Sequence, residues 1–408
     1  MRVLHLSTTD IGDGAARAAY RLHSGLQSQG VDSRMLVQQK KSSDNSVYGA
    51  EGQYGKLYSK IRRELDQFPL KRYRDREPEI FSPGWAPECR AKQIANHDVD
   101  LIHLHWICNG FMKLSSIEQF DHPIIWTLHD MWPFTGGCHY VKSCTNYQDR
   151  CGTCPHLGSN AEADLSRRVW HRKRDAWDDT PFTVVAPSQW LADCAADSSL
   201  FADATIKVIP NGLDTGRFRP RNTERTRQRL GLDPETKLVC FGANLQSNRK
   251  GADLLYEALN SFEMAGGNTE VVAFGNVDSD RAPAVDVPIH YLGFVEDAIL
   301  YQLYSDVDVM VVPSRQEAFG QTASEAMAAG TPVVAFDATG LRDIVDHQVT
   351  GYLAEPFKTD DLARGIDWVL ENEDRQKRLG EQARDIAIER FGKPVVAEQY
   401  REVYTELS

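Results

Sequence analysis

The sequence has the length and composition of a globular protein with more than one domain. Its 408 residues are 41% hydrophobic and 25% charged, which is ordinary globular usage at about twice the length of a typical domain. The 46 Lys and Arg against 58 Asp and Glu give a formal charge of −12, which argues against nucleic acid as the main partner. No segment approaches the roughly 18 apolar residues of a membrane span, and no signal-peptide core opens the chain. We therefore expect a cytoplasmic protein, peripheral on the inner face of the membrane if it contacts lipid.

The first half of the chain has the pattern of a parallel α/β unit. A short apolar strand at residues 3–6 is followed by the turn Gly12-Asp13-Gly14 and a helix at residues 15–29, with Gly30 where a C-terminal cap would be. Small and apolar residues recur every three or four positions in this helix, as on a buried helical face. Further short apolar runs, which suit strands buried on both faces, stand at residues 33–37, 100–105, 123–128, 182–186 and 205–209.

The pattern restarts in the second half. Apolar runs predict strands at residues 238–242, 271–275, 307–313 and 332–336, and helices are predicted at residues 251–262, 298–304 and 322–329. We expect an α/β protein with two Rossmann-like, doubly wound domains. The expected domains are residues 1–190, with a Cys-rich insertion at 136–158, and residues 204–385, followed by a C-terminal helix at 386–408 that could cross back to the first domain.

Residues 56–77 form a basic segment in an acidic protein. Seven basic residues stand against three acidic ones over residues 60–76, and Leu, Phe and Tyr are interleaved with them. Such a segment can be a solvated helix face. It can also contact anionic lipid or a lipid diphosphate, and we keep both interpretations.

The motif with the clearest chemistry covers residues 311–334. A buried strand ends, a loop carrying Glu317 follows, and a helix begins near Gly320 or Gln321 and ends at Gly330 before the next strand. In a parallel sheet such a turn lies at the carboxyl edge, where ligands bind. The N–H groups at a helix start favour an anionic or oxygen-rich ligand. Glu325 stands about one turn into the helix, so both carboxylates could face one crevice.

This motif is part of an ordered set that resembles the retaining glycosyltransferases of family 4, which have the GT-B fold. Glu317 and Glu325 are followed by the run Ala-Met-Ala-Ala-Gly-Thr-Pro-Val-Val, and the resemblance extends from about residue 3 to 385. The other matching segments are Leu128-His129-Asp130, Ile209 to Asp214, Arg249-Lys250-Gly251, Leu292 to Val295 and Thr350 to Leu353. The resemblance implies two Rossmann-like domains facing a central cleft, with the acceptor on the N-terminal side and a nucleoside diphosphate sugar in the C-terminal domain.

The resemblance also assigns residues to the sugar donor. It implies that Glu325 accepts hydrogen bonds from the ribose hydroxyls and that Glu317 holds the donor sugar. Lys250 and Arg249 would neutralise the diphosphate, as Mg²⁺ does in other transferases. The family commonly has an Arg after the glycine that follows the first strand of this domain; here Gly242 is followed by Ala243, and Arg249 would replace it. The remaining donor contacts are expected from Phe319, Gly320, Gln321 and Thr322 toward sugar or diphosphate, and from Gly293, Phe294 and Val295 toward the base.

In the first domain the resemblance singles out His129 and Asp130, directly after a predicted strand. The matching His in the family approaches the donor sugar, and Asp130 would orient its imidazole or bind the acceptor. Gly14 belongs to a glycine loop that would let backbone approach a phosphate closely. Read alone, this loop also suggests a dinucleotide fingerprint, but Arg17 occupies the third glycine position, which disfavours an NAD-linked oxidoreductase.

The insertion at 136–158 contains four clustered cysteines. Cys138, Cys144, Cys151 and Cys154 could close a tetrahedral structural zinc site. Packed free thiols and disulfides are the alternatives, the latter disfavoured in a chain without an export signal. The four remaining cysteines, expected to be isolated and mostly buried thiols, are Cys89, Cys108, Cys194 and Cys240.

The function expected is transfer of a hexose from a nucleoside diphosphate sugar to a hydroxyl of a polysaccharide or lipid-linked oligosaccharide, without a catalytic metal or other cofactor. Asp-x-Asp pairs, which bind metal in transferases of another fold, occur at Asp98/Asp100, Asp278/Asp280 and Asp306/Asp308, but we expect no catalytic metal there. The rival interpretations are a sugar-nucleotide hydrolase or phosphorylase, and a catalytically decayed sugar-nucleotide-binding scaffold of a polysaccharide assembly complex. The base, sugar, acceptor and linkage are not encoded in these motifs.

Overall fold

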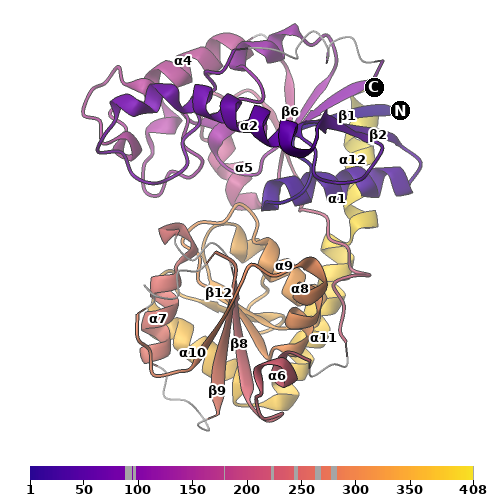
Figure 1. Cartoon of the computed structure of the whole chain (residues 1–408), viewed down its shortest axis with the longest axis vertical. Coiled ribbons are helices and arrows are strands. Elements are labelled where there is room, and N and C mark those ends of the chain that lie inside the picture. The colour runs from indigo at the N-terminus through magenta and orange to yellow at the C-terminus, as the bar shows by residue number, and fades with distance from the viewer. Residues whose placement is uncertain are drawn as a thin grey trace. The chain divides into compact units, whose positions relative to one another are not determined.

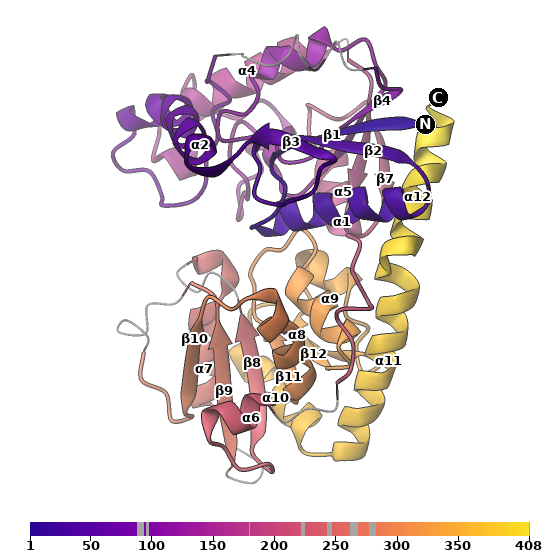
Figure 2. The ribbon, with the colours of Figure 1, turned by 45° about the vertical axis from the view of Figure 1, so that its right-hand side comes forward.

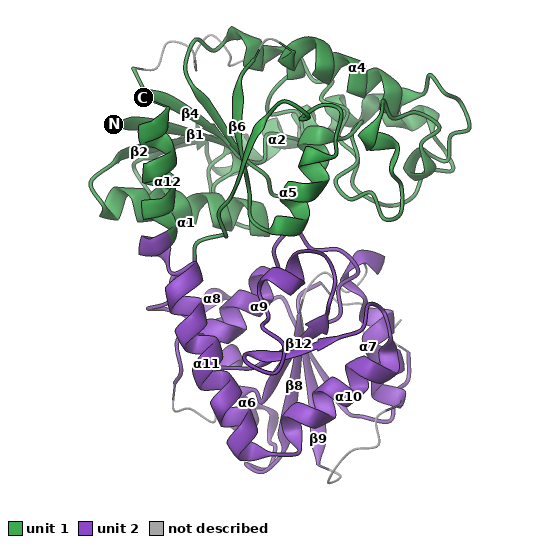
Figure 3. Cartoon of the chain, turned by 180° about the vertical axis from the view of Figure 1, so that it is seen from behind, with its two compact units in different colours: residues 1–212, 396–408 green, residues 213–395 purple. Residues whose placement is uncertain are grey.

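The computed structural model describes residues 1–87, 94, 98–178, 180–221, 225–242, 247–261, 268–276 and 283–407. It divides into two compact units (Figure 3): unit 1 comprises residues 1–212 and 396–408, and unit 2 comprises residues 213–395. The last part of the C-terminal helix therefore belongs to the same unit as the N-terminus. Cys89, Ala243, the pair Asp278/Asp280 and the last residue of the helix predicted at 251–262 lie outside the described residues.

Unit 1 is built on a parallel sheet of seven strands in the order β3-β2-β1-β4-β5-β6-β7. Figure 1 labels β1, β2 and β6 of this sheet. The central strands are buried along almost their whole length, as expected for strands covered on both faces. Their bounds are β1 Arg2–Thr9, β2 Asp32–Gln39, β3 Val47–Ala50, β4 Leu101–Leu104, β5 Ile124–Thr127, β6 Phe182–Ala186 and β7 Thr205–Val208.

Helices pack on both faces of this sheet. Asp13 caps the first helix by accepting a hydrogen bond of 2.9 Å from the Ala16 N–H, and Gly30 follows its end with φ of +81°. Apolar residues of the first and last helices share one buried cluster with β1, β4, β5 and β6. The helices are α1 Gly14–Ser28, α2 Gly52–Gln67, α4 Leu165–Trp177, α5 Gln189–Ala196 and, from residue 396 onward, α12 Lys393–Glu406.

Unit 2 has a parallel sheet of six strands in the order β10-β9-β8-β11-β12-β13 (Figure 2). Its strands are β8 Lys237–Gly242, β9 Thr269–Phe274, β10 Ile289–Gly293, β11 Val309–Val312, β12 Val333–Phe336 and β13 Gly351–Ala354. The helices that cover its two faces are α6 Arg225–Leu230, α7 Ala252–Asn260, α8 Asp297–Asp306, α9 Gln321–Ala328, α10 Thr359–Leu370 and α11 Glu373–Phe391. Two separate core clusters, one with α8, α9 and α11 and one with α7 and α10, fill the layers.

Three strands were not predicted, namely β3, β10 and β13. Each lies at the edge of its sheet, and each is only partly buried. An edge strand needs no continuous apolar run, because one of its sides is not covered by a neighbouring strand. The pattern that revealed the central strands is therefore absent from these three.

Each sheet has one point where the strand order reverses, between β1 and β4 in unit 1 and between β8 and β11 in unit 2. Loops that leave neighbouring strands diverge there, and the crevice at the carboxyl ends is where doubly wound sheets bind ligands. The fold thus presents one binding edge in each unit. No helix in the described part of the chain combines the length and the apolar character needed to cross a bilayer.

Candidate active site

Glu317 lies at the switch point of unit 2, in the loop between β11 and α9. It is 7% exposed, and its carboxylate forms an ion pair with Lys250. The Arg249 Nη1 lies 3.4 Å from its Oε2, and the Ser314 hydroxyl donates to its Oε1 at 2.9 Å. The structure therefore brings together the carboxylate and the two cations that the resemblance to family 4 had assigned to the same site.

Backbone hydrogen bonds lock the two loops that carry these side chains. The Arg249 guanidinium donates to the Gln316 carbonyl at 2.7 Å, and the Arg315 N–H donates to the Arg249 carbonyl at 2.8 Å. The Glu317 N–H donates to the Thr339 hydroxyl at 3.1 Å. Hydrogen bonds to backbone groups thus fix the two loops, in addition to the ion pairs between the charged side chains.

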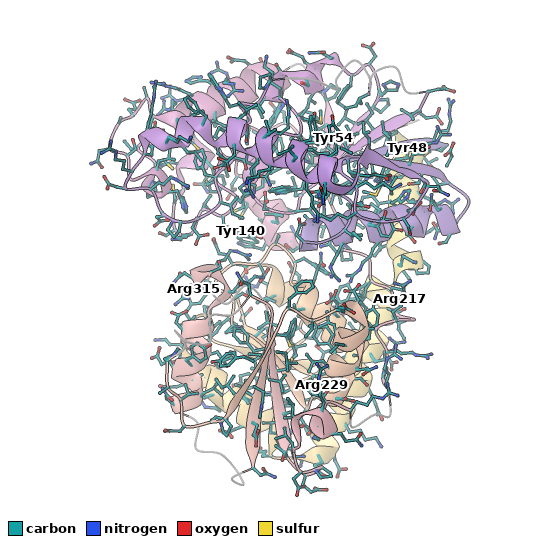
Figure 4. All side chains as sticks on the ribbon, viewed as in Figure 1. Tyr48, Tyr54, Tyr140, Arg217, Arg229 and Arg315 are labelled. Atoms are coloured by element: carbon teal, nitrogen blue, oxygen red, sulfur yellow. The ribbon has the colours of Figure 1, made fainter. Side chains whose placement is uncertain are left out.

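Gly251 explains how Lys250 comes so close to the end of β11. Its φ is +68°, and a Cβ at this position would stand 1.9 Å from the Pro313 carbonyl oxygen. Only glycine tolerates both the left-handed backbone and this approach. Two residues after Gly251, Asp253 at the start of α7 accepts hydrogen bonds of 2.8 and 2.6 Å from Arg315 (Figure 4). This ion pair is exposed to solvent at the outer edge of the site.

The electrostatics of the cluster keep Glu317 ionised. Burial alone would raise its pKa, but the charges of Lys250 and Arg249, with hydrogen bonds from Lys250 and Ser314, lower the pKa to about 2. For Lys250, burial lowers the pKa and the neighbouring Arg249 lowers it further, against the raising effect of Glu317. Two cations around one buried carboxylate leave an excess of positive charge, which suits an anionic ligand.

Glu325 lies on α9, 4% exposed, and accepts a hydrogen bond of 3.3 Å from the Tyr304 hydroxyl. The helix begins at Gln321, as predicted, with Gly320 as its N-cap at φ of +103°. A Cβ on Gly320 would meet the Leu341 side chain at 2.7 Å, so the tight entry into α9 requires glycine here. Phe319 is buried against Phe391 with ring centroids 5.5 Å apart, whereas Gln321 and Thr322 are half-buried.

The segment Gly293-Phe294-Val295 follows β10 at the carboxyl edge of the same sheet. Gly293 has φ of +63° and nothing within 4 Å of the position of a Cβ. Phe294 is 80% exposed, while Val295 packs against the core cluster of this face. The segment therefore offers open backbone and one exposed ring beside the strand end.

In unit 1 the structure separates the roles expected for His129 and Asp130. His129 hydrogen-bonds through Nε2 to His105 at 3.1 Å, not to Asp130. The buried Asp130 carboxylate instead accepts from Trp106 Nε1 at 2.8 Å and from the Trp132 N–H at 2.9 Å. Asp130 thus does not orient the His129 imidazole through a hydrogen bond, because its oxygens are turned to other partners.

Asp130 also joins the Cys-rich insertion to the sheet. Its Oδ2 lies 2.6 Å from His139 Nδ1, and His139 Nε2 lies 2.9 Å from the Ser82 hydroxyl. This is the order of a Ser-His-Asp triad. All three residues are buried, Ser82 completely, so the group is a buried polar network that a substrate cannot reach.

Sequence reasoning missed three histidines beneath His129. His5 on β1, His103 on β4 and His105 directly after it are buried, and one ring nitrogen from each lies within 4.8 Å of the others. Positions 103 and 105 alternate along the strand, so both rings lie on one face. The signal available in the sequence was the pair of histidines, 103 and 105, at alternate positions of an otherwise apolar strand.

The glycine loop after β1 leads into the start of α1. Gly12 has φ of +133°, and a Cβ there would meet the Lys41 ammonium at 2.7 Å. Gly14 is the first residue of α1. The N-terminus of this 15-residue helix thus lies at the carboxyl end of β1, next to the switch point of unit 1.

The four clustered cysteines are free thiols. Burial raises the pKa of Cys138 well above its ordinary value, that of Cys151 to about 12 and that of Cys154 to about 11. Tetrahedral zinc holds its sulfur ligands about 3.8 Å apart. Among the described residues, the group of three or more ligand atoms within 4.8 Å of one another is the His5, His103 and His105 cluster, not the cysteines. The sulfur atoms do not fit zinc as placed, and we derive no role for a metal here. Of the isolated thiols, Cys108 and Cys240 are buried and Cys194 is half-buried.

The two Asp-x-Asp pairs in the described residues are engaged in structural contacts. Asp98 and Asp100 both pair with Arg2. Asp306 accepts two hydrogen bonds of 2.9 Å from Thr226, and Asp308 pairs with Arg227 at 2.5 Å. Carboxylates used in this way stabilise loop and strand ends.

Two family models match the chain. The one described as Glycosyltransferase Family 4 matches residues 12–217, and the one described as Glycosyl transferases group 1 matches residues 222–386. D-inositol 3-phosphate glycosyltransferase of Corynebacterium aurimucosum is 28% identical over 76% of this chain and 72% of that relative. Curated relatives are matched over only part of their own length, for example 53% of one and 74% of another.

Solved structures share the fold. HepE of Anabaena, solved with UDP and glucose, superposes with a TM-score of 0.66 at 20% identity, covering all of both chains. Sucrose-phosphate synthase of Thermosynechococcus elongatus gives a TM-score of 0.70 at 19% identity, covering 100% of this chain and 99% of that one. The two Rossmann-like units are those of the GT-B fold.

Proposed function

Because the chain belongs to family 4 of the glycosyltransferases, we propose that it transfers a hexose with retention of configuration to a hydroxyl of a polysaccharide or lipid-linked oligosaccharide. It is a glycosyltransferase that uses a nucleotide sugar; retention, the hexose and the acceptor are the proposal. The observation that carries it is the Glu317 carboxylate held by Lys250 and Arg249 at the switch point of unit 2. A solved relative of the fold binds UDP and glucose, so UDP-glucose is the first donor to test.

In the proposed mechanism the two cations stabilise the leaving diphosphate. As the bond between the anomeric carbon and the phosphate oxygen breaks, negative charge grows on that oxygen, and Lys250 and Arg249 compensate it. The acceptor hydroxyl attacks from the same face, and the leaving phosphate takes its proton. The products are the nucleoside diphosphate and the new glycoside. No divalent metal is required, because the cations come from the protein.

Glu317 is proposed to bind hydroxyls of the donor sugar rather than to act as a covalent nucleophile. Its carboxylate already accepts hydrogen bonds from Lys250 and Ser314, which lowers its nucleophilicity. Glu325 is proposed to accept the ribose hydroxyls, the backbone at Gly293 to Val295 to meet the base, and α9 from Phe319 to Thr322 to meet sugar or diphosphate. His129 is proposed to hydrogen-bond the same sugar, and Gly14 to let a phosphate or acceptor oxygen approach the start of α1.

We further propose that unit 1 contacts an anionic membrane surface through α2. Its buried side consists of Gly55, Arg62 and Asp66. A second side carries an apolar stripe that solvent reaches and that continues to Phe68, directly after the helix. The exposed fractions are 72%, 59%, 51%, 47% and 62% for Tyr54 (Figure 4), Leu57, Ile61, Leu65 and Phe68.

The spacing of the stripe supports this proposal. Steps of three and four residues place all five side chains on one face, and a row of exposed apolar residues in a protein surface marks an interaction site. The basic residues of the same segment attract anionic lipid headgroups, while the stripe enters the acyl boundary. A lipid-linked acceptor would be met at that surface.

The proposed function is tested first by ligand-induced stabilisation. A ligand at about 100 times its Kd adds about 2.7 kcal/mol to the stability of the protein. We expect one of UDP, GDP or ADP, and its sugar, to raise the Tm equally in EDTA and in Mg²⁺. Transfer to an acceptor without added phosphate would then separate a transferase from a phosphorylase. No shift with any nucleotide would contradict the proposal and favour a scaffold.

A further inference from the structure

A chain of three imidazoles leads from the core of unit 1 to His129. His5 Nδ1 lies 2.9 Å from His105 Nε2, and His105 Nδ1 lies 3.1 Å from His129 Nε2. His5 and His105 are buried, with 0% and 3% exposed, and His129 is half-buried. The candidate sugar-binding ring is thus the outer end of a hydrogen-bonded row.

The geometry of the row is that of hydrogen bonds and not of a shared metal. The ring planes of successive members are nearly parallel, at 23° for His5 and His105 and 27° for His105 and His129. In each link the lone pair of the accepting nitrogen points at the N–H of the next ring, so it is not directed at a shared ion. The third ring of the cluster, His103, already contacts the Tyr404 and Thr127 hydroxyls at 2.7 Å through its two nitrogens.

Neutral rings allow two proton arrangements along the row. Burial lowers the pKa of His5 and His105 well below the ordinary value, and it lowers the pKa of His129 to about 4 against the raising effect of Asp130 and Asp13. Each ring therefore carries one N–H at pH 7. In the first arrangement His5 carries its proton on Nε2, so His105 Nε2 donates to His5 Nδ1 and His129 Nε2 donates to His105 Nδ1. In the second arrangement His5 Nδ1 donates to His105 Nε2, and His105 Nδ1 donates to His129 Nε2.

The buried end of the row decides between the two arrangements. His5 Nε2 is buried and has no hydrogen-bond partner within the described part of the chain. The first arrangement would leave an N–H group unpaired there, and the second leaves only a lone pair. Unpaired buried N–H groups are the rarer and costlier of the two. The second arrangement is therefore favoured.

We propose that His5 and His105 fix His129 as the Nδ1–H tautomer, so that His129 presents a hydrogen-bond donor. No partner for its Nδ1 is present among the described residues. Resting on the proposed function, this makes His129 a neutral donor to an oxygen of the donor sugar rather than a general base. His5 and His105 are positioning residues, because they act through His129.

The test is the tautomer of His129, read by ¹⁵N NMR of histidine-labelled full-length protein without ligand at pH 7.5. We expect a pyrrole-type Nδ1 and a pyridine-type Nε2, assigned by loss of the signals in His129→Asn. A pyrrole-type Nε2 would overturn the inference whatever the activity. If the expected tautomer is found but no sugar is transferred, the tautomer stands and the proposed function fails.

Variants of the row separate positioning from packing. His105→Leu removes the donor to His129, and we expect mixed tautomers and a fall in kcat/KM of about tenfold, with UDP-induced stabilisation unchanged. His105→Asn keeps an N–H near the position of Nδ1 and should restore a single tautomer and most of the rate. His23→Gln is the matched control, because the His23 ring meets His5 edge-on but hydrogen-bonds to Ser33 and Ser46 rather than to the row. A His129 tautomer unaffected by His105→Leu would overturn the inference.

Discussion

At the scale of single residues, the site of unit 2 is a cluster in which the buried carboxylate remains ionised because two cations and a hydroxyl surround it. Glu317 is buried with two cations and a hydroxyl around it. Removing one member of such a group leaves the others with an uncompensated charge in a poorly solvated place. Substitutions here are therefore expected to act on both chemistry and local structure, and controls must separate the two.

Lys250→Ala should slow transfer far more than it weakens nucleotide binding. Loss of one preorganised charge at a developing anion costs about 10² to 10³ in kcat. Steady-state transfer and UDP-induced Tm shifts measure the two effects. Arg315→Ala is the matched control, since its ion pair with Asp253 is exposed at the rim and should contribute less than about 1 kcal/mol. A wild-type rate for Lys250→Ala would show that the assignment of the diphosphate contact is wrong.

Glu325→Ala should weaken nucleotide binding. Two hydrogen bonds from ribose to a carboxylate contribute about 3 kcal/mol or more together, so the Kd for the nucleoside diphosphate should rise at least about a hundredfold. Isothermal titration calorimetry with UDP measures this Kd. Tyr304→Phe, which removes the hydroxyl that donates to Glu325, should have a smaller effect. Unchanged UDP affinity in Glu325→Ala would place the ribose elsewhere.

At the scale of elements, position in the sheet decided what the sequence revealed. The central strands, the edge strand β7 and α1, α7, α8 and α9 were predicted near their observed bounds, whereas the other three edge strands, β3, β10 and β13, were missed. The sequence identified the segment of α2 as basic, with Leu, Phe and Tyr interleaved. Only the structure showed which face of the helix is buried. Its apolar stripe faces away from the core.

Charge placed in that stripe should reduce binding to anionic vesicles. Leu57→Glu with Ile61→Glu removes apolar area and adds repulsion, so co-sedimentation with phosphatidylglycerol vesicles should fall at least about tenfold. Phe357→Glu, an exposed apolar residue of unit 2, is the control. Both proteins should retain the Tm of the parent. Equal binding of parent and double variant would show that α2 is a solvated face.

The Cys-rich insertion should contain little zinc. Because its sulfur atoms do not gather within 4.8 Å, we expect purified protein to carry zinc well below one equivalent, with all thiols reactive after unfolding. Metal analysis of protein prepared without chelator measures this. A full equivalent of zinc, lost on chelation together with thermal stability, would mean that the thiols converge on a metal that stabilises the fold.

At the scale of the whole molecule, folding buries several neutral histidines in unit 1. Burial lowers their pKa values, to about 4 for His23 and His129 and well below the ordinary value for His5, His103 and His105. In the unfolded chain the same groups titrate near 6.5. Below that pH the unfolded state binds more protons than the folded state, so stability is lost as the pH falls.

Stability should therefore drop steeply between pH 6.5 and 5. Each of these histidines contributes a slope of up to about 1.4 kcal/mol per pH unit, while Glu317, with a pKa of about 2, acts only in stronger acid. Urea unfolding at pH 7.5, 6.5, 5.8 and 5.0 measures the slope. His5→Phe should make the slope shallower. A free energy of unfolding that is constant from pH 7 to 5 would contradict neutral burial.

The sequence by itself determined the α/β class, the two-domain order and the start of α9. These follow from local patterns: apolar runs, glycines at turns, and motifs that sit at strand ends. The grouping of Glu317 with Lys250 and Arg249 was implied by the resemblance to family 4, and the ion pairs in the structure agree with it. Only the tertiary structure decided that Asp130 serves His139 and that His105 serves His129. It also decided that no three of the clustered cysteine sulfurs lie within 4.8 Å of one another. The partners of the histidines come from elements far apart in the chain, 100 residues apart for His5 and His105 and 301 for His103 and Tyr404. No local sequence pattern encodes such pairs.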